Sequence, residues 1–296
     1  MKIGLMATPW EWPTDSVRVA QMAEERGIES IWFGEHSHLP VPTKHAFSRE
    51  TPEFYRRVPD PYIVLAAIAT ATKTIRLGTG ISLPAEHNPL TLAKSIATLD
   101  QVSRGRFEWG VGYGWNPLEM VNRGLDPQYR MATFREVVLA VRRLWTQDSA
   151  HADGPRVRFT ESWSWPKPRQ QPHPPILLGC RAGDRSFGQL VEFCDGWMPE
   201  VRQTIADIDE TLPRLRARWE QAGRDPAALR LTFIDSGFWK DVDAQSYRDD
   251  VMIKPDVLLR LRDLGADRVI IGMPMFRYDD VEPMLDAVAG MTTLVR

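Results

Sequence analysis

Short apolar segments alternate with amphipathic helical patterns along almost the whole chain, and this alternation limits the possible folds more than any other feature. An apolar run of strand length followed by an amphipathic run of helix length is the signature of a βα unit, and successive units build a parallel sheet. We count eight such units. They favour an α/β fold of the (β/α)8 type, a TIM barrel, in which functional side chains follow the C-terminal ends of the strands. The predicted strands are Lys2–Met6, Ser30–Gly34, Ile75–Ser82, Arg106–Val111, Pro175–Leu178, Gly196–Met198, Leu229–Ile234 and Arg268–Ile271.

The length of the chain fits one barrel with loop insertions. A (β/α)8 barrel of about 250 residues is a single domain, so we predict one domain over residues 1–296. The first helix is expected to have its N-cap within Thr14–Ser16 and to stop at Gly27. The connections at residues 35–60, 146–174 and 236–255 are long for a compact domain, and we interpret them as a lid over the barrel mouth and two further excursions.

The composition excludes several classes of protein. Hydrophobic residues make up 43% of the chain, charged residues 26%, and the net charge is -2, so no polycationic face for nucleic acid is expected. The two cysteines, Cys180 and Cys194, are too few for a disulfide framework. The chain opens on a strand pattern and contains no apolar run of about 18 residues, so we expect a cytoplasmic protein without a signal peptide or a membrane span.

Two of the predicted strands end in glycine-rich turns. The first reads Leu77-Gly78-Thr79-Gly80-Ile81, and the second reads Gly110-Val111-Gly112-Tyr113-Gly114-Trp115. Glycine in a strand removes the side chain that would keep another group away, so repeated glycines mark a bulge or a close approach of the backbone. Both turns are candidates for admitting a flat ligand, although a glycine that gives room to a neighbouring side chain produces the same pattern.

These two motifs resemble those of the bacterial luciferase-like superfamily, whose members are flavin-dependent monooxygenases or oxidoreductases that use the deazaflavin coenzyme F-420. Further matches cover most of the chain, and they are Asn88–Lys94, Leu99–Phe107, Arg130, Phe134–Trp145, Pro166–Pro175 and Asp195–Trp197. The resemblance implies a luciferase-like barrel that is similar to the F-420 group and commonly forms a homodimer.

The resemblance also implies a site for the cofactor ring. It places a non-prolyl cis peptide bond at Gly80–Ile81, in a bulge behind the central ring of the bound flavin or deazaflavin. Thr79, Gly112, Tyr113 and Gly114 are the other residues that we expect to contact the cofactor at this end.

Gly179-Cys180-Arg181-Ala182 is the candidate phosphate site. Here a predicted strand passes through a glycine turn into a helix, whose N-terminus offers free N–H groups and a positive dipole, and Arg181 adds charge. The family commonly has a second glycine where this chain has Cys180. No G-x-G-x-x-G fingerprint follows the first strand, which argues against a Rossmann dinucleotide site.

Ionisable side chains follow the second predicted strand in the order Glu35-His36-Ser37-His38. Histidine suits proton transfer near neutral pH, and the resemblance makes His36 the leading catalytic candidate, with Glu35 either catalytic or orienting its neighbour. From the residues alone, a loop histidine bonded to a carbonyl is a competing interpretation. The H-x-H pattern also suits zinc, but a catalytic zinc needs three protein ligands, and the other histidines do not follow predicted strands. We therefore predict no metal.

Trp10, Trp12 and Trp115 follow the first and fourth predicted strands and are candidates for lining the substrate pocket, with ordinary packing as the alternative. Asn116 and Glu119 belong to the family pattern Gly-Trp-Asn-x-x-Glu, where Glu119 also suits a helix cap.

The expected function is F-420-dependent hydride transfer to or from a small organic substrate. F-420-dependent glucose-6-phosphate dehydrogenases carry a glutamate where this chain has Trp115, so a bulky apolar pocket and a hydrophobic substrate are expected instead. The alternatives are an FMN-dependent monooxygenase and a cofactor-binding protein without turnover.

Overall fold

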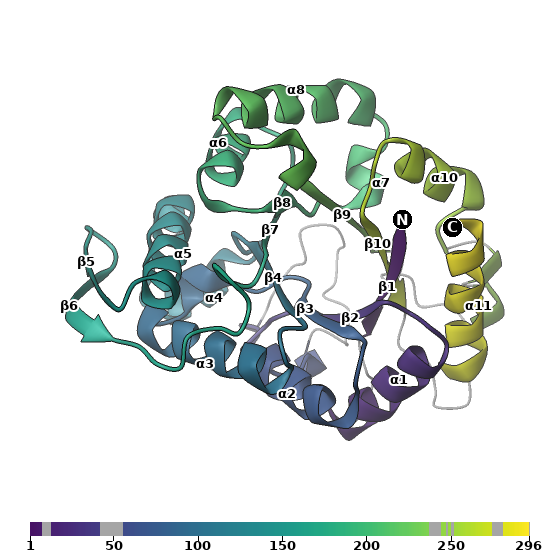
Figure 1. The fold of residues 1–296 in the computed structure, drawn as a ribbon, viewed down its shortest axis with the longest axis horizontal. Coiled ribbons are helices and arrows are strands. Elements are labelled where there is room, and N and C mark those ends of the chain that lie inside the picture. The colour runs from purple at the N-terminus through teal and green to yellow at the C-terminus, as the bar shows by residue number, and fades with distance from the viewer. Residues whose placement is uncertain are drawn as a thin grey trace.

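The computed structural model describes residues 1–7, 13–41, 56–236, 244–246, 248–249, 252–273 and 281–295. Parallel strands close into a barrel in the order β1-β10-β9-β8-β7-β4-β3-β2, with helices around it (Figure 1). The predicted (β/α)8 barrel is therefore confirmed. Its strands are β1 (Lys2–Ala7), β2 (Ser30–Phe33), β3 (Arg76–Thr79), β4 (Phe107–Gly112), β7 (Ile176–Gly179), β8 (Gly196–Trp197), β9 (Arg230–Asp235) and β10 (Arg268–Met273).

Every predicted strand is present, but the third one ends early. We expected it to reach Ser82, whereas β3 stops at Thr79. The peptide bond between Gly80 and Ile81, just after the end of β3, is cis. Beyond Thr79, Ser82 pairs with β4 through an isolated parallel bridge to Val111.

Helices cover the outside of the barrel and lie between successive strands (Figure 1). The α-helices are α1 (Pro13–Glu25), α2 (Pro61–Ala71), α3 (Pro89–Val102), α4 (Pro117–Asn122), α5 (Arg130–Thr146), α6 (Asp184–Phe193), α7 (Val201–Thr204), α8 (Ile208–Gln221), α9 (Ala244–Ser246), α10 (Pro255–Asp263) and α11 (Val281–Leu294). The short 3-10 turns are η2 (Pro84–Glu86), η3 (Pro127–Tyr129) and η4 (Pro226–Ala228).

The first helix starts earlier than the sequence predicted. It begins at Pro13, so the expected N-cap within Thr14–Ser16 was wrong and these residues lie in its first turn. Proline suits this position because its fixed φ matches the helix and its missing N–H is not needed there. The predicted end is confirmed, since Gly27 has a φ of +72° just beyond the last turn.

Large side chains fill the inside of the barrel, and glycines on the strands make room for them. The buried cluster consists of Met6, Trp32, Leu177, Met198 and Ile270. A Cβ on Gly78 would lie 2.1 Å from the Trp32 ring. A Cβ on Gly110 would lie 2.0 Å from the backbone carbonyl oxygen of Thr79 and 2.8 Å from the sulfur of Met198. Gly78 therefore gives room to a neighbouring side chain, the alternative that the sequence left open, whereas Gly110 allows the close approach of the backbone that the sequence predicted. A second buried core lies between the strands and the helices.

The connection at residues 146–174 contains an antiparallel hairpin of β5 (Ser149–Asp153) and β6 (Arg158–Trp163). The sequence indicated only an excursion here, because β6 is largely exposed and shows no alternation of buried and exposed positions. Gln170 Nε2 donates to Asp100 Oδ1 at 2.7 Å and ties the end of this connection to α3.

The other two long connections fall partly outside the described residues, so the lid that we expected at residues 35–60 stays a prediction. None of the helices in the described part of the chain combines the length and the apolar character needed to cross a membrane.

Four charged residues lie together at the N-terminal end of the barrel, and we call Glu29, Arg76, Glu108 and Arg268 the basal ion cluster. Arg268 donates to Glu108 Oε2 at 2.8 Å and to Glu29 Oε2 at 2.7 Å, while Arg76 Nε donates to Glu108 Oε1 at 2.5 Å. Burial alone would raise the pKa of Glu108, but the charge and hydrogen bonds of Arg268, together with the charge of Arg76, lower that pKa to about 2.

We predict that Glu108→Gln lowers the free energy of unfolding by about 3 kcal/mol, because it leaves the buried Arg268 without one of its two counter-charges. The folded pKa of about 2 lies below the ordinary value of 4.5. The stabilisation is therefore complete above about pH 4.5 and is lost as the pH falls toward 2. Denaturant unfolding of both proteins across this range should show the difference shrinking at low pH.

The matched control is Asp153→Asn, which removes an ion pair with Arg158 whose side chains are 77% and 74% exposed. Such a pair contributes under about 1 kcal/mol. Equal losses in the two variants would contradict the structural role of the basal ion cluster.

Candidate active site

The parallel barrel brings the predicted site residues to one end, because the C-terminal ends of the strands share one face. The segments that follow β2, β3, β4 and β7 there contain Glu35 and His36, Gly80–Ile81, Tyr113–Trp115 and Cys180–Ala182. Trp10 and Trp12 lie outside the described residues, so their place beside a substrate stays a prediction.

The cis peptide bond that the resemblance implied is present between Gly80 and Ile81. The side chain of Ile81 lies across two glycines of neighbouring strands. A Cβ on Gly112 would lie 2.1 Å from Ile81 Cδ1, and a Cβ on Gly179 would lie 3.0 Å from it. Thr79 Oγ1 donates to the carbonyl of Gly110 at 2.7 Å and ties β3 to β4 just before the bulge. Glycine at 112 and 179 thus lets the bulge lie close against β4 and β7.

The carboxylate of Glu35 is directed at the segment after this bulge. It accepts hydrogen bonds from Ser82 Oγ at 2.8 Å, from the backbone N–H of Leu83 at 2.7 Å and from His87 Nε2 at 2.5 Å. Burial alone would raise the pKa of Glu35, but the hydrogen bonds and the charge of His87 hold that pKa below its ordinary value. Glu35 therefore anchors the bulge, and its described contacts do not include His36.

The hydrogen bonds around Ser82 continue to side chains of α2 and β4. Tyr62 Oη lies 2.6 Å from Ser82 Oγ, and Trp109 Nε1 donates to Tyr62 Oη at 3.2 Å. Burial, together with the nearby charge of Glu35, raises the pKa of Tyr62 well above its ordinary value, so the phenol stays neutral.

The imidazole of His36 is held between an acid and an indole. Nδ1 lies 3.0 and 3.1 Å from the two carboxylate oxygens of Glu119, and Trp115 Nε1 donates to Nε2 at 3.3 Å. The side chains of His36 and Glu119 are 8% and 1% exposed. Asn116 Nδ2 donates to Glu119 Oε1 at 3.0 Å, while Asn116 Oδ1 caps α4 through the N–H of Leu118.

The sequence did not predict the contact between His36 and Glu119. Glu119 stands three residues after the cap Asn116, a spacing at which a glutamate usually turns back to the start of its own helix. Its carboxylate instead faces the loop after β2, which no local spacing indicates.

A second buried acid, Glu86, adjoins this group. Its Oε2 lies 3.3 Å from Arg123 Nε, and its Oε1 lies 3.8 Å from where a Cβ on Gly114 would stand. Burial and the charge of Glu119 raise the pKa of Glu86 to about 7, against the lowering effect of Arg123. Sequence reasoning missed this residue, because its η2 turn lies within a connection that has no distinctive motif.

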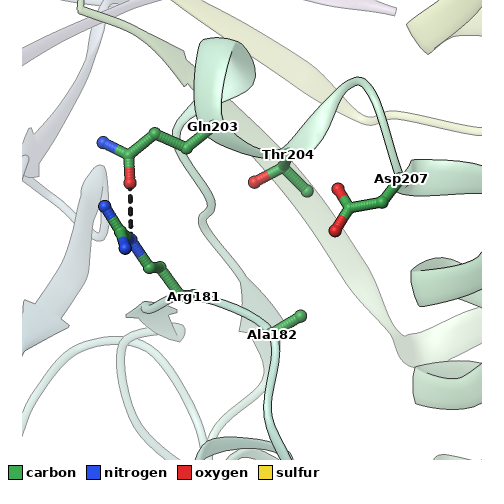
Figure 2. A pocket seen from close by; sticks show the side chains of 5 residues that line it. All are labelled: Arg181, Ala182, Gln203, Thr204 and Asp207. Carbon is green, nitrogen blue, oxygen red and sulfur yellow. Dashed lines mark hydrogen bonds between the residues drawn. The ribbon is translucent and has the colours of Figure 1, made fainter.

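A cavity of about 370 Å³ adjoins the end of β7, where the phosphate site was predicted. Figure 2 shows its lining residues, which are Arg181, Ala182, Gln203, Thr204 and Asp207. Arg181 Nε donates to Gln203 Oε1 at 2.8 Å. Gly183 precedes α6 and offers no side chain to cap the helix. The cavity therefore has a cation beside a helix start, and Asp207 also brings a carboxylate to it.

Two predicted cofactor residues, Cys180 and Tyr113, have partners within the protein. Burial raises the pKa of the Cys180 thiol to about 12, so the thiol is neutral. The Cys180 carbonyl accepts from Trp197 Nε1 at 3.0 Å. Tyr113 donates to Gln189 Oε1 at 3.2 Å and packs edge-on against Phe134.

The H-x-H pair does not converge on a common point. His38 contacts Ser37 Oγ at 2.8 Å and Asn122 Nδ2 at 3.1 Å, whereas His36 contacts Glu119 and Trp115. The described residues contain no group of three or more His, Cys, Asp or Glu side chains that could hold a metal ion.

A closed parallel barrel whose mouth carries a cis bulge after β3 and a buried histidine after β2 defines an α/β-barrel protein of the luciferase-like class. Residues 4–249 match the model of the luciferase-like monooxygenase family, and the chain belongs to this family. The resemblance drawn from the sequence is confirmed. Members of the luciferase-like family are oxidoreductases and monooxygenases.

Relatives of the chain include proteins named for two different cofactors. An uncharacterized protein of Mycobacterium tuberculosis is 39% identical over 278 residues, which are 92% of this chain and 91% of that protein. An F-420-dependent glucose-6-phosphate dehydrogenase of Amycolatopsis mediterranei is 29% identical, and the match covers 100% of this chain and 92% of that enzyme. A third relative, from Acinetobacter baylyi, is the oxygenase component of a flavin-dependent trigonelline monooxygenase. It is 31% identical, and the match covers 56% of this chain and 43% of that protein.

Solved structures show the same fold. The monooxygenase RslO1 from Streptomyces bottropensis superposes with a TM-score of 0.79 at 23% identity, covering 99% of each chain.

We predict that the pair of Glu35 and His87 stabilises the protein less at alkaline pH. Burial alone would lower the pKa of His87, but the hydrogen bond and the charge of Glu35 raise it above its ordinary 6.5. The contribution is therefore fully present below pH 6.5 and is lost as the pH rises through the raised folded pKa. The free energy of unfolding lost in His87→Gln should be larger at about pH 6 than at about pH 9.

His151→Gln serves as the control, because His151 is exposed on β5. Its effect on unfolding should be the same at both pH values. A loss in His87→Gln that does not change with pH would show that the ion pair has no share in the stability.

Proposed function

We propose that the protein is a coenzyme F-420-dependent oxidoreductase that transfers hydride between the deazaflavin and a small hydrophobic organic substrate. The carrying observation is that the bulge at Gly80–Ile81 and the Arg181 cavity both lie at strand ends of one barrel mouth, where His36 is also held. The F-420-dependent relative, which matches over the full length of this chain, supports the choice of cofactor.

The residues present fit such a cofactor. Gly112 and Gly179 leave the surface beside the bulge without side chains of their own, so that Ile81 lies close to the backbone of β4 and β7. The bulge and the Ile81 side chain therefore lie close against the barrel, where they would support one face of a flat ring. A phosphate needs a cation or a helix start. Arg181 and the start of α6 supply both at the cavity after β7.

The bound deazaflavin would supply the hydride chemistry, and the protein would supply orientation and proton handling. His36 would hold or release the substrate proton at Nε2, while Glu119 keeps the ring in place through Nδ1. Glu35 would act on the site indirectly, because it anchors Ser82 and Leu83 just after the bulge.

The indole of Trp115 favours a hydrophobic substrate. It stands where the sugar-phosphate enzymes of the F-420 group carry a glutamate, and it packs edge-on against His36 with ring centroids 5.4 Å apart. An indole offers an apolar face and a single N–H donor, so it suits a largely apolar molecule with one polar group near His36.

FMN-dependent monooxygenation is the second candidate, favoured by the 31% identity to the flavin-dependent oxygenase component. The same bulge and phosphate cavity suit FMN, which is also flat and carries a phosphate. The reaction would then be oxygen activation by the reduced flavin.

Equilibrium titration of the purified protein with F-420 and, separately, with FMN distinguishes the two. We expect F-420 to bind with a dissociation constant that is at least tenfold lower, a difference of about 1.4 kcal/mol. Cofactor fluorescence reports both titrations. A preference for FMN would replace the proposed reaction with oxygen chemistry, and binding of neither would overturn the proposal of a cofactor enzyme.

Reversing the charge at the cavity tests the phosphate end. Arg181→Glu should weaken cofactor binding by about tenfold or more, because it sets a negative charge beside the phosphate. Arg158→Glu is the matched control, since the same charge change on the exposed hairpin should leave the affinity unaltered. Undiminished binding by Arg181→Glu would place the phosphate elsewhere.

A further inference from the structure

The two nitrogens of His36 contact groups of opposite hydrogen-bonding character. A carboxylate only accepts hydrogen bonds, whereas an indole N–H only donates them. Nδ1 faces both oxygens of Glu119, and Nε2 faces the indole N–H of Trp115. We infer that Glu119 is a positioning residue that fixes His36 as the neutral Nδ1–H tautomer and presents the lone pair of Nε2 as the proton acceptor of the site.

Each contact requires the same tautomer independently. The bonds from Nδ1 to Glu119, at 3.0 and 3.1 Å, place the proton on Nδ1. The bond that Trp115 donates, at 3.3 Å, needs a lone pair on Nε2. The opposite tautomer would set a bare nitrogen against a carboxylate and two N–H groups against each other, and both arrangements are repulsive.

Glu119 is itself firmly held. Its side chain is 1% exposed, and Asn116 donates to Oε1 at 3.0 Å from the start of the same helix. A carboxylate in the first turn of a helix also lies at the positive end of the helix dipole. His36 therefore has a fixed, buried acceptor for Nδ1.

The neighbouring acid leaves this arrangement intact. Glu86 pairs with Arg123 and has no described contact with His36. The charge of Glu119 and the burial of Glu86 raise the pKa of Glu86 to about 7, so near neutral pH Glu86 is a carboxyl that readily takes up a proton. Uptake of a proton by Glu86 lowers the repulsion between Glu86 and Glu119.

The catalytic meaning of this inference rests on the proposed function, whereas the tautomer does not. In an enzyme of that kind, a substrate hydroxyl would replace the bond from Trp115 and donate to Nε2. Protonation of Nε2 would leave an imidazolium whose second N–H still faces Glu119, so the carboxylate stabilises the charge that develops.

Nitrogen-15 NMR of the full chain labelled at histidine, without cofactor and at a pH where imidazoles are neutral, reads the tautomer directly. The signals of His36 are assigned by their loss in His36→Gln. We expect a protonated Nδ1 and an unprotonated Nε2 in the wild type. A protonated Nε2, or an even mixture of tautomers, would overturn the inference without any further variant.

Three variants test the role of Glu119. Glu119→Leu removes the acceptor and should shift His36 toward the Nε2–H tautomer, whereas Glu119→Gln keeps an acceptor oxygen of nearly the same shape and should retain the Nδ1–H form. Glu86→Gln is the matched control, because Glu86 is a buried acid without a described contact to His36, and this variant should leave the ring signals in place. A tautomer that is unchanged in Glu119→Leu would assign the orientation to other groups.

Kinetics add a readout that a purely structural role would not give. Once a substrate is known, kinetics of Glu119→Leu can be measured. We expect kcat to fall by about 10- to 100-fold, which is the usual effect of removing a group that orients a functional histidine, and KM to stay within about threefold. A rise in KM with unchanged kcat would overturn the positioning role. Failure to bind F-420 or FMN would refute the proposed function alone, since the NMR result is obtained without cofactor.

Discussion

A closed barrel of eight strands has a fixed interior, and the rest of this structure depends on how that interior is filled. Trp32 is fully buried because Gly78 on the next strand has no side chain, and Gly110 likewise leaves room for the Thr79 carbonyl and for Met198. Close packing of this kind tolerates little change in volume. The same device continues at the mouth, where Ile81 lies over Gly112 and Gly179, so the shape of the site follows from the packing beneath it.

Charge is arranged differently at the two ends of the barrel. At the N-terminal end, the basal ion cluster sets two arginines against two glutamates, which suits a structural role. At the mouth, three buried acids each face a different cation or histidine: Glu35 faces His87, Glu86 faces Arg123 and Glu119 faces His36. Histidines can change charge near neutral pH. Of these two groups of charges, only the one at the mouth contains histidines.

The sequence was sufficient for the barrel, because periodic apolar runs report directly on strands and helices that bury one face. It failed where the structure depends on contacts between distant segments. The hairpin of β5 and β6 was missed because none of the residues of β6 is buried and β5 buries only two of its five residues. The partner of His36 was missed because Glu119 lies 83 residues away in the chain. Glu35 was correctly placed at the mouth, but only the fold shows that its carboxylate faces Ser82 and His87.

Short local sequence motifs specify where the helices α2, α3 and α4 begin. Asp60, Asn88 and Asn116 each precede a proline, and their side chains accept hydrogen bonds from the first N–H groups of α2, α3 and α4. Two adjacent residues thus specify where each of these helices begins, with little help from the rest of the molecule. The start of each helix is therefore set separately from the loop residues that precede its cap. Because the caps are separate from these loops, a barrel of this kind can acquire new substrates through changes in its loops while its strands and helices keep their positions.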